Sequence, residues 1–296
     1  MTTPPPTAPA IAVVGSVNMD LVVTTDALPE PGETLLGNSF QTIPGGKGSN
    51  QAIAAAKAGG AVTFIGAVGS DGFAAELRSN LHAAGVDCSL LRTAPGPSGI
   101  AAIAVNKSAE NTIVVVPGAN FAMTSLADSD TAAIASSAML VCQLEIPMTT
   151  VVAAAQAAQT AGVPVLLNPS PMQNLSAELL AATTILIVNE GEAREIGSAA
   201  DHVAHVIVTL GGAGARYRGP DGAAFQVPVP DIDPIDTTGA GDGFAGAFAV
   251  AWAEGQSPLQ AVRFACCAGA LATTVRGAST SSPLRADIDR LVSLTY

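Results

Sequence analysis

The chain has 296 residues, a length that fits one large α/β domain or two small ones. Hydrophobic residues make up 49% of it and charged residues only 12%, a composition typical of a compact globular protein and not of a disordered one. The formal net charge of -12 argues against a nucleic-acid partner, because proteins that bind a phosphate backbone carry clusters of Lys and Arg. A small anionic ligand is compatible with this charge, since backbone N–H groups at helix starts bind phosphate.

The start of the chain predicts neither export nor membrane insertion. Residues 1–10 form a Thr/Pro-rich tail that we expect to be disordered, without the basic residues and apolar run of a signal peptide. The longest apolar candidate for a membrane span, residues 244–253, has about half the length that a bilayer requires. Cys88, Cys142, Cys266 and Cys267 show no Cys-x-x-Cys spacing, so we expect reduced core thiols. These features predict a cytoplasmic protein with no membrane partner.

The first part of the chain alternates strands and helices. A short apolar run at 11–17 predicts a buried strand, and Asn18 and Asp20 follow at its end. Because residues two apart on an extended chain point the same way, these two side chains can contact one ligand. Next come a strand at 34–43, an Ala-rich helix at 49–58, a strand at 63–68 and a helix at 72–84. This alternation is typical of an α/β fold.

The rest of the chain adds a hairpin and further α/β units. Residues 99–105 and 112–116 predict two hairpin strands outside the alternating pattern. Further strands are predicted at 139–143, 163–168, 185–189 and 206–210, and helices from 239 to about 254 and from about 258 to 275. The simplest architecture is one α/β domain over residues 11–296, with a small β appendage.

The sharpest local signal is the run Asp-Thr-Thr-Gly-Ala-Gly-Asp-Gly-Phe at 236–244. Its small residues leave successive N–H groups open at the positive end of a helix, which suits an oxyanion or a phosphate. Asp242 can cap this helix, or it can accept a proton from a hydroxyl that attacks a phosphoryl group held by the same amides. The local sequence leaves both interpretations open.

A second Gly-rich turn, Gly-Gly-Lys-Gly-Ser-Asn at 45–50, precedes the first helix. It is not a Walker A loop, because Lys47 is followed by Gly and the earlier glycine spacing is absent. The turn is either a flexible segment with a solvated lysine or a place where the backbone approaches a sugar closely, with Asn50 binding hydroxyls.

Two further segments at strand ends have a ligand-binding and a purely structural interpretation. The acids of Asn-Glu-Gly-Glu at 189–192 can organise Mg²⁺ through water, or they can favour the next helix N-terminus. The Gly-rich strand exit at 209–214 can admit a nucleotide or form a simple turn. His202 and His205 lack a Cys partner or a nearby carboxylate signature, so we do not expect a metal site there.

Eight motifs occur in a fixed order along the chain. They are GSVNMD (15–20), PGET (31–34), GGKGSNQA (45–52), PGAN (117–120), QLE (143–145), NP (168–169), NEGE (189–192) and DTTGAGDGF (236–244). In this order they resemble the ribokinase branch of the PfkB carbohydrate kinase family over about residues 11–283. The resemblance implies a three-layer α/β/α sandwich with a mainly parallel central sheet. It also implies a small β lid, from about 20–42 and 99–116, that covers the sugar and commonly forms a homodimer.

The resemblance also implies a reaction, the transfer of the γ-phosphoryl group of ATP to the 5-hydroxyl of D-ribose, with Asp242 as the catalytic base. The ribose-binding residues would be Asn18, Asp20, Gly45, Gly46, Lys47, Asn50 and Glu145, together with Asp242. The backbone amides of Gly239, Ala240 and Gly241 would form the anion hole for the charge on the transferred phosphoryl group.

ATP and two cations complete the site that the resemblance implies. ATP would lie along Asn189, Thr209, Gly211, Gly214, Gly241 and Cys266. Glu192 would help to place Mg²⁺ through water. A monovalent cation, usually K⁺ in this family, would bind beside the anion hole at Asp236, Thr238, Ala272, Val275, Gly277 and Ser281, partly through backbone carbonyls.

The chain departs from the family pattern at two places. Residues 193–205 are too few for a helix that ribokinases have there, so we expect the edge of the nucleotide half to be trimmed or rearranged. Cys266 stands where the family often has His or Asn near the adenine, which bears on nucleotide preference. The acceptor alternatives are adenosine, fructose or another sugar, and a non-catalytic sugar-binding regulator is a further alternative. Asn18, Asp20 and the turn at 45–50 favour ribose, and an intact Asp242 favours catalysis.

Overall fold

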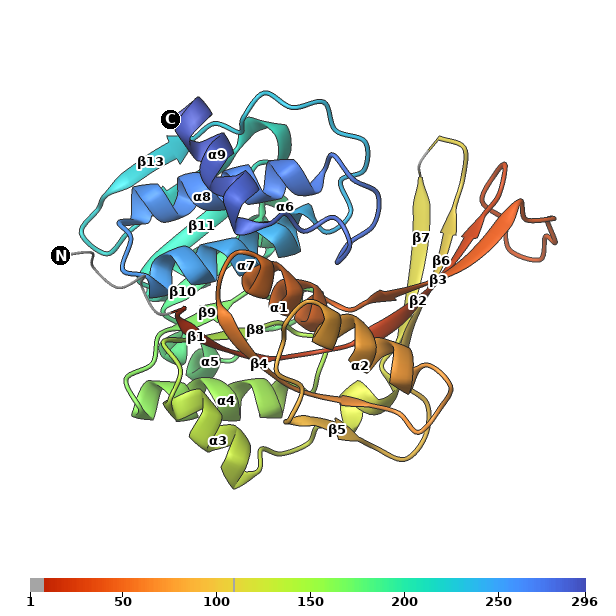
Figure 1. Cartoon of the computed structure of the whole chain (residues 1–296), viewed down its shortest axis with the longest axis horizontal. Helices are drawn as coiled ribbons and strands as arrows, with labels where there is room; N and C mark the ends of the chain where they lie inside the picture. The colour runs from red at the N-terminus through yellow and green to blue at the C-terminus, as the bar shows by residue number, and fades with distance from the viewer. Residues whose placement is uncertain (1–7, 109) are drawn as a thin grey trace.

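The computed structural model of the chain describes residues 8–108 and 110–296. A nine-stranded sheet crosses the molecule between two layers of helices, and a four-stranded sheet projects from one side of this body (Figure 1). The predicted α/β/α sandwich with a small β lid is therefore confirmed. Within the described ranges, we find no helix that is both long and apolar enough to span a bilayer.

The large sheet is mainly parallel. In spatial order it contains β13 (Ala224–Val227), β12 (Ala215–Arg218), β11 (His205–Thr209), β10 (Ile185–Asn189), β9 (Val165–Leu167), β8 (Met139–Cys142), β1 (Ala10–Val14), β4 (Ala61–Val68) and β5 (Leu91–Thr93). Neighbours from β11 to β5 pair in parallel, whereas β12 and β13 add an antiparallel edge. Because helices cover both faces, the central strands are continuous apolar runs, and every residue of β8 is buried.

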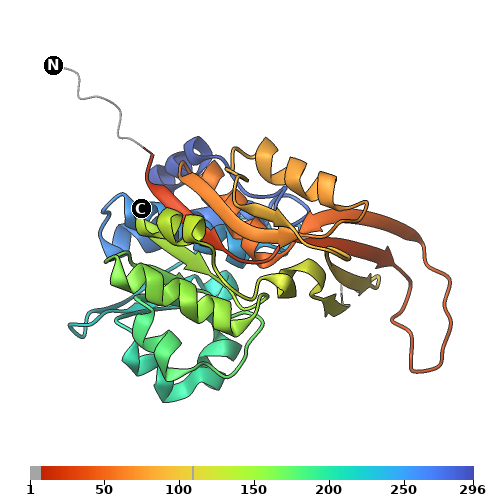
Figure 2. The same ribbon diagram turned by 90° about the horizontal axis from the view of Figure 1, so that it is seen from below.

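The small sheet is the predicted lid. Its strands lie in the order β3 (Ser39–Gly45), β2 (Asn18–Thr24), β6 (Gly99–Val105) and β7 (Asn111–Val116). The hairpin of β6 and β7 agrees with the prediction, but the strand expected from 34 begins only at Ser39. Residues before it follow the turn at Gly32, and Leu36 is 94% exposed. The connection between β2 and β3 reaches far from the body (Figure 2).

Helices form one layer on each face of the large sheet (Figure 2). One layer contains α1 (Lys47–Lys57), α2 (Ala74–Ala83), α7 (Ala240–Ala253), α8 (Pro258–Ala272) and α9 (Arg285–Thr295). The other contains α3 (Asp128–Ala135), α4 (Met148–Thr160), α5 (Ala177–Ala182) and α6 (Glu190–Ile196). Short 3₁₀ turns lie at η1 (Gly118–Ala122), η2 (Gly197–His202) and η3 (Gly211–Ala213).

Helices α1 and α7 run side by side and in the same direction, and glycine makes their close contact possible. A Cβ atom on Gly246 of α7 would lie 2.6 Å from the carbonyl oxygen of Gln51 and 2.7 Å from the Cβ atom of Ala54, both on α1. No larger residue fits at Gly246 without separating the helices. This contact sets the first turns of the two helices next to each other.

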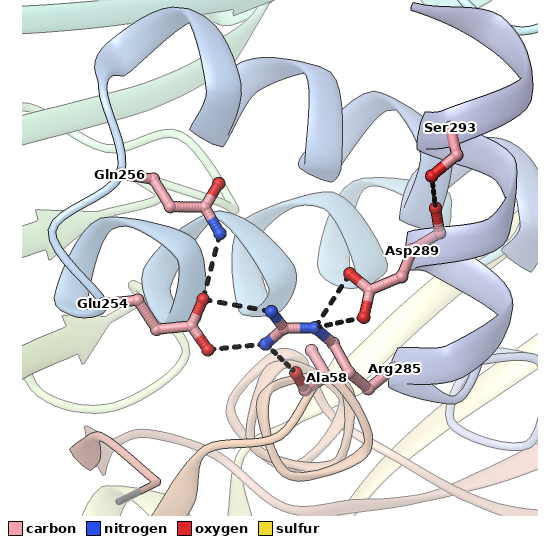
Figure 3. A network of polar contacts seen from close by, with 6 residues as sticks. All are labelled: Ala58, Glu254, Gln256, Arg285, Asp289 and Ser293. Carbon is pink, nitrogen blue, oxygen red and sulfur yellow. Dashed lines mark hydrogen bonds and ion pairs between the residues drawn. The ribbon is translucent and has the colours of Figure 1, made fainter. Parts of the chain in front are cut away.

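The far ends of the same two helices are joined through α9. The Arg285 guanidinium pairs with Glu254 after α7 and with Asp289 one turn later in α9, and it donates to the carbonyl oxygen of Ala58 after α1 at 3.3 Å (Figure 3). The same guanidinium lies over the ring of Phe264, 4.9 Å from its centroid. Arg285 thus fastens the last helix to the layer that contains α1 and α7.

Several elements differ in detail from the sequence prediction. Residues 1–7 of the expected tail lie outside the described ranges, and Ala10 already belongs to β1, where it pairs with Ala61. As expected for the short segment at 193–205, α6 is followed only by the 3₁₀ turn η2 before β11 begins. Strands β5, β12 and β13 and helix α9 were not predicted. The three strands are only three or four residues long, too short for a clear periodic pattern.

Candidate active site

The carboxylate of Glu145 joins the end of β1 to the start of α1. It accepts hydrogen bonds from the Ser16 hydroxyl, from Asn18 Nδ2 at 3.4 Å and from the backbone N–H of Lys47 at 3.0 Å. Asn120 Nδ2 in turn donates to Asn18 Oδ1 at 2.7 Å. Three of the predicted sugar-binding residues, Asn18, Lys47 and Glu145, are therefore held together by direct hydrogen bonds.

Asp20 lies on β2 of the lid, two residues after Asn18. Burial, together with the negative charges of Glu145 and Asp242, raises its pKa to about 7. Gly45 on the paired strand leaves room for this carboxylate, since a Cβ atom there would lie 2.3 Å from Asp20 Oδ2. Gly46 must also be glycine, because its φ is +92° and a Cβ atom would lie 2.7 Å from the backbone nitrogen of Asn18. The turn at 45–48 is thus closely packed and not a loose loop.

The Lys47 ammonium lies in the field of several carboxylates. The negative charge of Asp242 raises the pKa of Lys47, burial opposes this change, and Glu145 and Glu192 add to the increase. Lys47 is therefore a partly buried lysine among carboxylates, which favours the ligand-binding interpretation of this turn over a freely solvated side chain. Lys47 also lines a cavity of about 150 Å³ with Asn189 and Asp242, where it can meet anionic groups.

Asp242 lies in the first turn of α7 and is only 8% exposed. Its Oδ2 atom accepts a hydrogen bond from Asn50 Nδ2 at 3.1 Å, and its Oδ1 atom accepts one from Gln51 Nε2 at 3.0 Å. The N-cap of α7 is Gly239, which makes no side-chain cap bond. The carboxylate thus points to α1 and not to its own helix start, so the capping interpretation of Asp242 is wrong.

The turn before α7 brings backbone amides to the edge of the same cavity. Gly239 has a φ of +77°, and a Cβ atom there would lie 2.7 Å from the Cα atom of Ala278, so glycine is required. The N–H group of Ala240 donates to the carbonyl of Thr237 at 3.2 Å. That of Gly241 lies in the first turn, where an α-helix offers no acceptor. Of the amides predicted for the anion hole, Ala240 is thus already engaged within the turn.

A second cavity, of about 320 Å³, adjoins the first. Its walls are largely apolar, and they include Thr209, Gly211, Gly214, Gly241 and Cys266 from the predicted nucleotide site. Thr209 and Gly241 also line the smaller cavity, so the two cavities are neighbours that share these walls. Burial raises the pKa of the Cys266 thiol to about 12, so this residue acts as an apolar wall and not as a nucleophile.

Asn189 and Glu192 form a capping box at the start of α6. Asn189 Oδ1 accepts from the Glu192 N–H at 2.9 Å, and Glu192 Oε2 accepts from the Asn189 N–H at 2.8 Å. The structural interpretation of this pair is confirmed. Both residues also line the 150 Å³ cavity across from Asp242. Carboxylate oxygens around a cavity with room for several waters fit Mg²⁺, which keeps several waters in protein sites.

Asp236 joins the two segments of the predicted monovalent-cation site. Its carboxylate accepts from the N–H groups of Thr238 at 2.9 Å and Gly277 at 3.0 Å. Burial opposes ionisation of Asp236, but these hydrogen bonds and the charge of Arg276 outweigh it and lower the pKa. The backbone amide of Asp236 also donates to the carbonyl of Thr273 just after α8. A charged oxygen ligand therefore lies between the two segments, which fits a cation.

Several site residues have no role in the sequence prediction. They are Gln51, Asn120, Gln143 and Asn168, and all four stand inside the motifs of the resemblance. Gln143 directly follows β8, and Asn168 directly follows β9. A polar residue at the carboxyl end of a parallel strand is the signal that could have identified these two.

His205 is held by structural contacts. His205 Nδ1 lies 2.7 Å from the Tyr217 hydroxyl, and its ring packs against Trp252. Among the described residues, no group of three or more His, Cys, Asp or Glu side chains could hold a metal ion.

Comparison with known proteins assigns the chain to a family. A model of the pfkB family carbohydrate kinases matches residues 8–285. The ribokinase of Bacillus subtilis is 39% identical over 300 residues, which cover 96% of this chain and 99% of that protein. The structure of Arabidopsis thaliana ribokinase complexed with ribose and ATP superimposes with a TM-score of 0.90 at 33% identity, over 96% of this chain and 99% of that one. Thermotoga maritima ribokinase gives a TM-score of 0.88 at 32% identity, over 96% and 99%. The chain therefore belongs to the pfkB family of carbohydrate kinases.

Proposed function

We propose that this protein catalyses the ATP-dependent phosphorylation of D-ribose at its 5-hydroxyl, giving D-ribose 5-phosphate and ADP. The observation that carries the proposal is the place of Asp242, which accepts a hydrogen bond from Asn50 of the sugar-binding group and lines the 150 Å³ cavity together with Gly241. The similar ribokinases of Bacillus subtilis and Arabidopsis thaliana support ribose as the acceptor.

The sugar site is rich in groups that bind hydroxyls. Asn18, Asp20, Asn50 and Glu145 offer amide and carboxylate atoms, each of which can hold one or two hydroxyls. The buried Oδ1 atom of Asn50 has no hydrogen-bond donor among the described residues, so it can accept from a substrate hydroxyl. Such a site discriminates against analogues that lack a hydroxyl, because its polar atoms would then stay unpaired.

The reaction follows from the position of the base. Asp242 accepts the proton of the 5-hydroxyl while the oxygen attacks the γ-phosphorus of ATP, and the bond from phosphorus to the oxygen of ADP breaks. Backbone N–H groups at the start of α7 stabilise the charge on the transferred phosphoryl group, with Gly241 nearest to both cavities. Lys47 adds a positive charge in the same space.

Two cations support this reaction. Mg²⁺ bound with ATP would neutralise phosphate charge, and Glu192, which lines the same cavity as Asp242, would hold its water shell. A monovalent cation, K⁺ by preference, binds at Asp236 and the carbonyl groups of the loop after α8. The hydrogen bonds that Asp236 accepts from Thr238 and Gly277 support this site, because they keep its carboxylate ionised and oriented.

The lid also offers a surface for a second copy of the chain. Phe40 on β3 is 61% exposed, and Val114 on β7 is 64% exposed. Every residue of β7 is exposed although four of its six residues are apolar. An exposed apolar strand face of this kind is typical of an interface, so we expect a homodimer through the lids. The predicted cytoplasmic location stays a prediction.

The test is ADP release from Mg-ATP with D-ribose, adenosine or fructose as the acceptor, in K⁺ and again in Na⁺. Ribose-dependent turnover that K⁺ enhances is the expected result. Turnover with adenosine or fructose but not with ribose would overturn the acceptor and keep the kinase chemistry. Ribose binding without turnover for any acceptor would favour the non-catalytic regulator.

A further inference from the structure

A chain of three amide side chains, Gln51, Gln143 and Asn168, is hydrogen-bonded to the carboxylate of Asp242, and the two glutamines in it are fully buried. Gln51 is fully buried, and its Nε2 atom donates both to Asp242 Oδ1 at 3.0 Å and to Asn168 Oδ1 at 2.9 Å. Its Oε1 atom accepts from Gln143 Nε2 at 2.7 Å. Asn168 Nδ2 donates further to the carbonyl of Ile187 at 2.9 Å. The chain thus runs from the base to the carboxyl ends of three adjacent strands, β8, β9 and β10.

The contacts allow only one orientation of the Gln51 amide. Both hydrogens of Nε2 point to oxygen acceptors, and Oε1 receives a hydrogen from Gln143. A flipped amide would place Oε1 against the oxygens of Asp242 and Asn168, and its NH₂ group against that of Gln143. Gln51 is therefore fixed as a donor to Asp242.

Asn50 holds the other oxygen of the Asp242 carboxylate. Its Nδ2 atom donates to Asp242 Oδ2 at 3.1 Å, so each carboxylate oxygen accepts one amide hydrogen from the first turn of α1. Since a carboxylate oxygen has two lone pairs, one on each oxygen stays available for a substrate proton. Two donors on adjacent residues thus fix both torsions of Asp242 without occupying all its acceptor sites.

We infer that Gln51 is a positioning residue for Asp242. The amides of Gln143 and Asn168, at the edge of the large sheet, hold Gln51 itself in place. This inference rests on the proposed function, in which Asp242 is the base. A base must lie within about 2.6 to 3.2 Å of the hydroxyl whose proton it takes. A displacement of about 1 Å can cost on the order of a hundredfold in rate. The chain of amides fixes the position of the Asp242 carboxylate relative to the rigid edge of the large sheet.

The test compares Gln51→Leu and Gln143→Met with the unaltered protein. We expect Gln51→Leu to lower kcat about 10- to 100-fold, because it removes one donor and the link to the sheet. Gln143→Met keeps the Gln51–Asp242 bond and should lower kcat about threefold to tenfold. Ribose affinity, measured by calorimetry without ATP, should change less than about threefold in both, because neither variant alters the sugar-binding groups. Gln143→Met also serves if Gln51→Leu fails to fold.

A matched control separates positioning from mere stability. Thr150 is also fully buried, and its hydroxyl donates to the Met123 carbonyl on the opposite face of the sheet. Thr150→Val should lower the melting temperature and leave kcat unchanged. If Gln51→Leu and Gln143→Met behave like Thr150→Val, with lower melting temperature but normal kcat, the inference is overturned. Normal turnover in Asp242→Asn would instead overturn the proposed base, so the two failures are distinguishable.

A third variant tests the donor role through pH. Gln51→Glu has nearly the same shape but brings a second carboxylate to the place of the donor. Like charges this close share a proton, so the pH–rate profile should move to higher pH. An unshifted profile with normal kcat would contradict the contact between this side chain and the working base.

Discussion

Helices α1 and α7 are bridged by a polar network at each end, and the two networks differ in composition. At the first turns, Asn50 and Gln51 donate neutral amide hydrogens to Asp242, which is 8% exposed. At the last turns, Arg285 joins Ala58 and Glu254 through a charged and partly exposed network (Figure 3). Both networks hold the same pair of helices together.

The difference reflects what each end must do. A guanidinium that pairs with a carboxylate through two bonds neutralises its charge, which suits an anchor. Amide donors orient a carboxylate without a formal positive charge in contact with it, which leaves it able to take a proton. Changes at the first turns should therefore affect turnover, and changes at the last turns should affect stability.

The largest expected effect is on turnover. Asp242→Asn keeps the shape of the side chain but removes the proton acceptor, so kcat should fall by at least about a hundredfold. Binding of ribose and ATP, followed by thermal shift, should persist. A variant with near-normal kcat would exclude Asp242 as the base and leave the two networks without a functional difference.

The next effect sharpens the comparison within the catalytic end, the first turns of α1 and α7, since we propose that Asp20 binds the sugar and takes no part in the reaction. Its pKa is raised to about 7, so its charged form is lost as pH falls through 7. A carboxylate accepts hydroxyl hydrogens more strongly than a carboxylic acid does, so ribose affinity should fall as pH drops from 8 to 6. Asp20→Asn should bind ribose about tenfold more weakly at pH 8, on the scale of a charge-assisted hydrogen bond. Its affinity should not change over this range.

Calorimetry at several pH values checks this prediction, with ATP affinity as the control. Equal weakening of ribose and ATP in Asp20→Asn would contradict its place in the sugar site. If ribose binding by Asp20→Asn keeps the pH dependence of the unaltered protein, the titrating group is not Asp20.

The sequence predicted the first turns of α1 and α7, the catalytic end, better than their last turns around Arg285, the anchoring end. Glycines, carboxylates and amides at 45–50 and 236–244 form local patterns whose chemistry is specific, and the resemblance supplied their order. The amide chain could not be derived, because Gln51, Gln143 and Asn168 come together only when β8, β9 and α1 meet in the fold. For Arg285, only the pair with Asp289, four residues later, forms a local pattern, since its other partners, Glu254 and Ala58, lie 31 and 227 residues away along the chain.

The anchoring end should show a change in stability without a change in chemistry. Arg285→Met keeps an apolar stem over Phe264 but removes the pairs with Glu254 and Asp289, so we expect the free energy of unfolding to fall by about 1 to 2 kcal/mol. The modest figure reflects partial exposure, because the Arg285 side chain is 34% exposed. Urea denaturation measures the loss. The kcat of the folded variant should equal that of the unaltered protein, and a tenfold fall would show that the two ends are coupled.

The smallest effect is expected at Lys57, the last residue of α1. Its ammonium donates to the carbonyl oxygens of Ser279 at 3.3 Å and Ser282 at 3.1 Å, in the loop that follows Gly277. Lys57→Met removes these bonds but keeps the aliphatic stem, so unfolding should become easier by about 0.5 to 1 kcal/mol. Because this loop also carries Gly277, which donates to Asp236, loosening it should raise the K⁺ concentration needed for half-maximal activity. Measuring K⁺ activation beside urea denaturation decides whether this contact is purely an anchor, as at Arg285, or also serves the site. A loss of stability with an unchanged K⁺ curve would place Lys57 with Arg285, and a shifted curve would show that this end of α1 contributes to both.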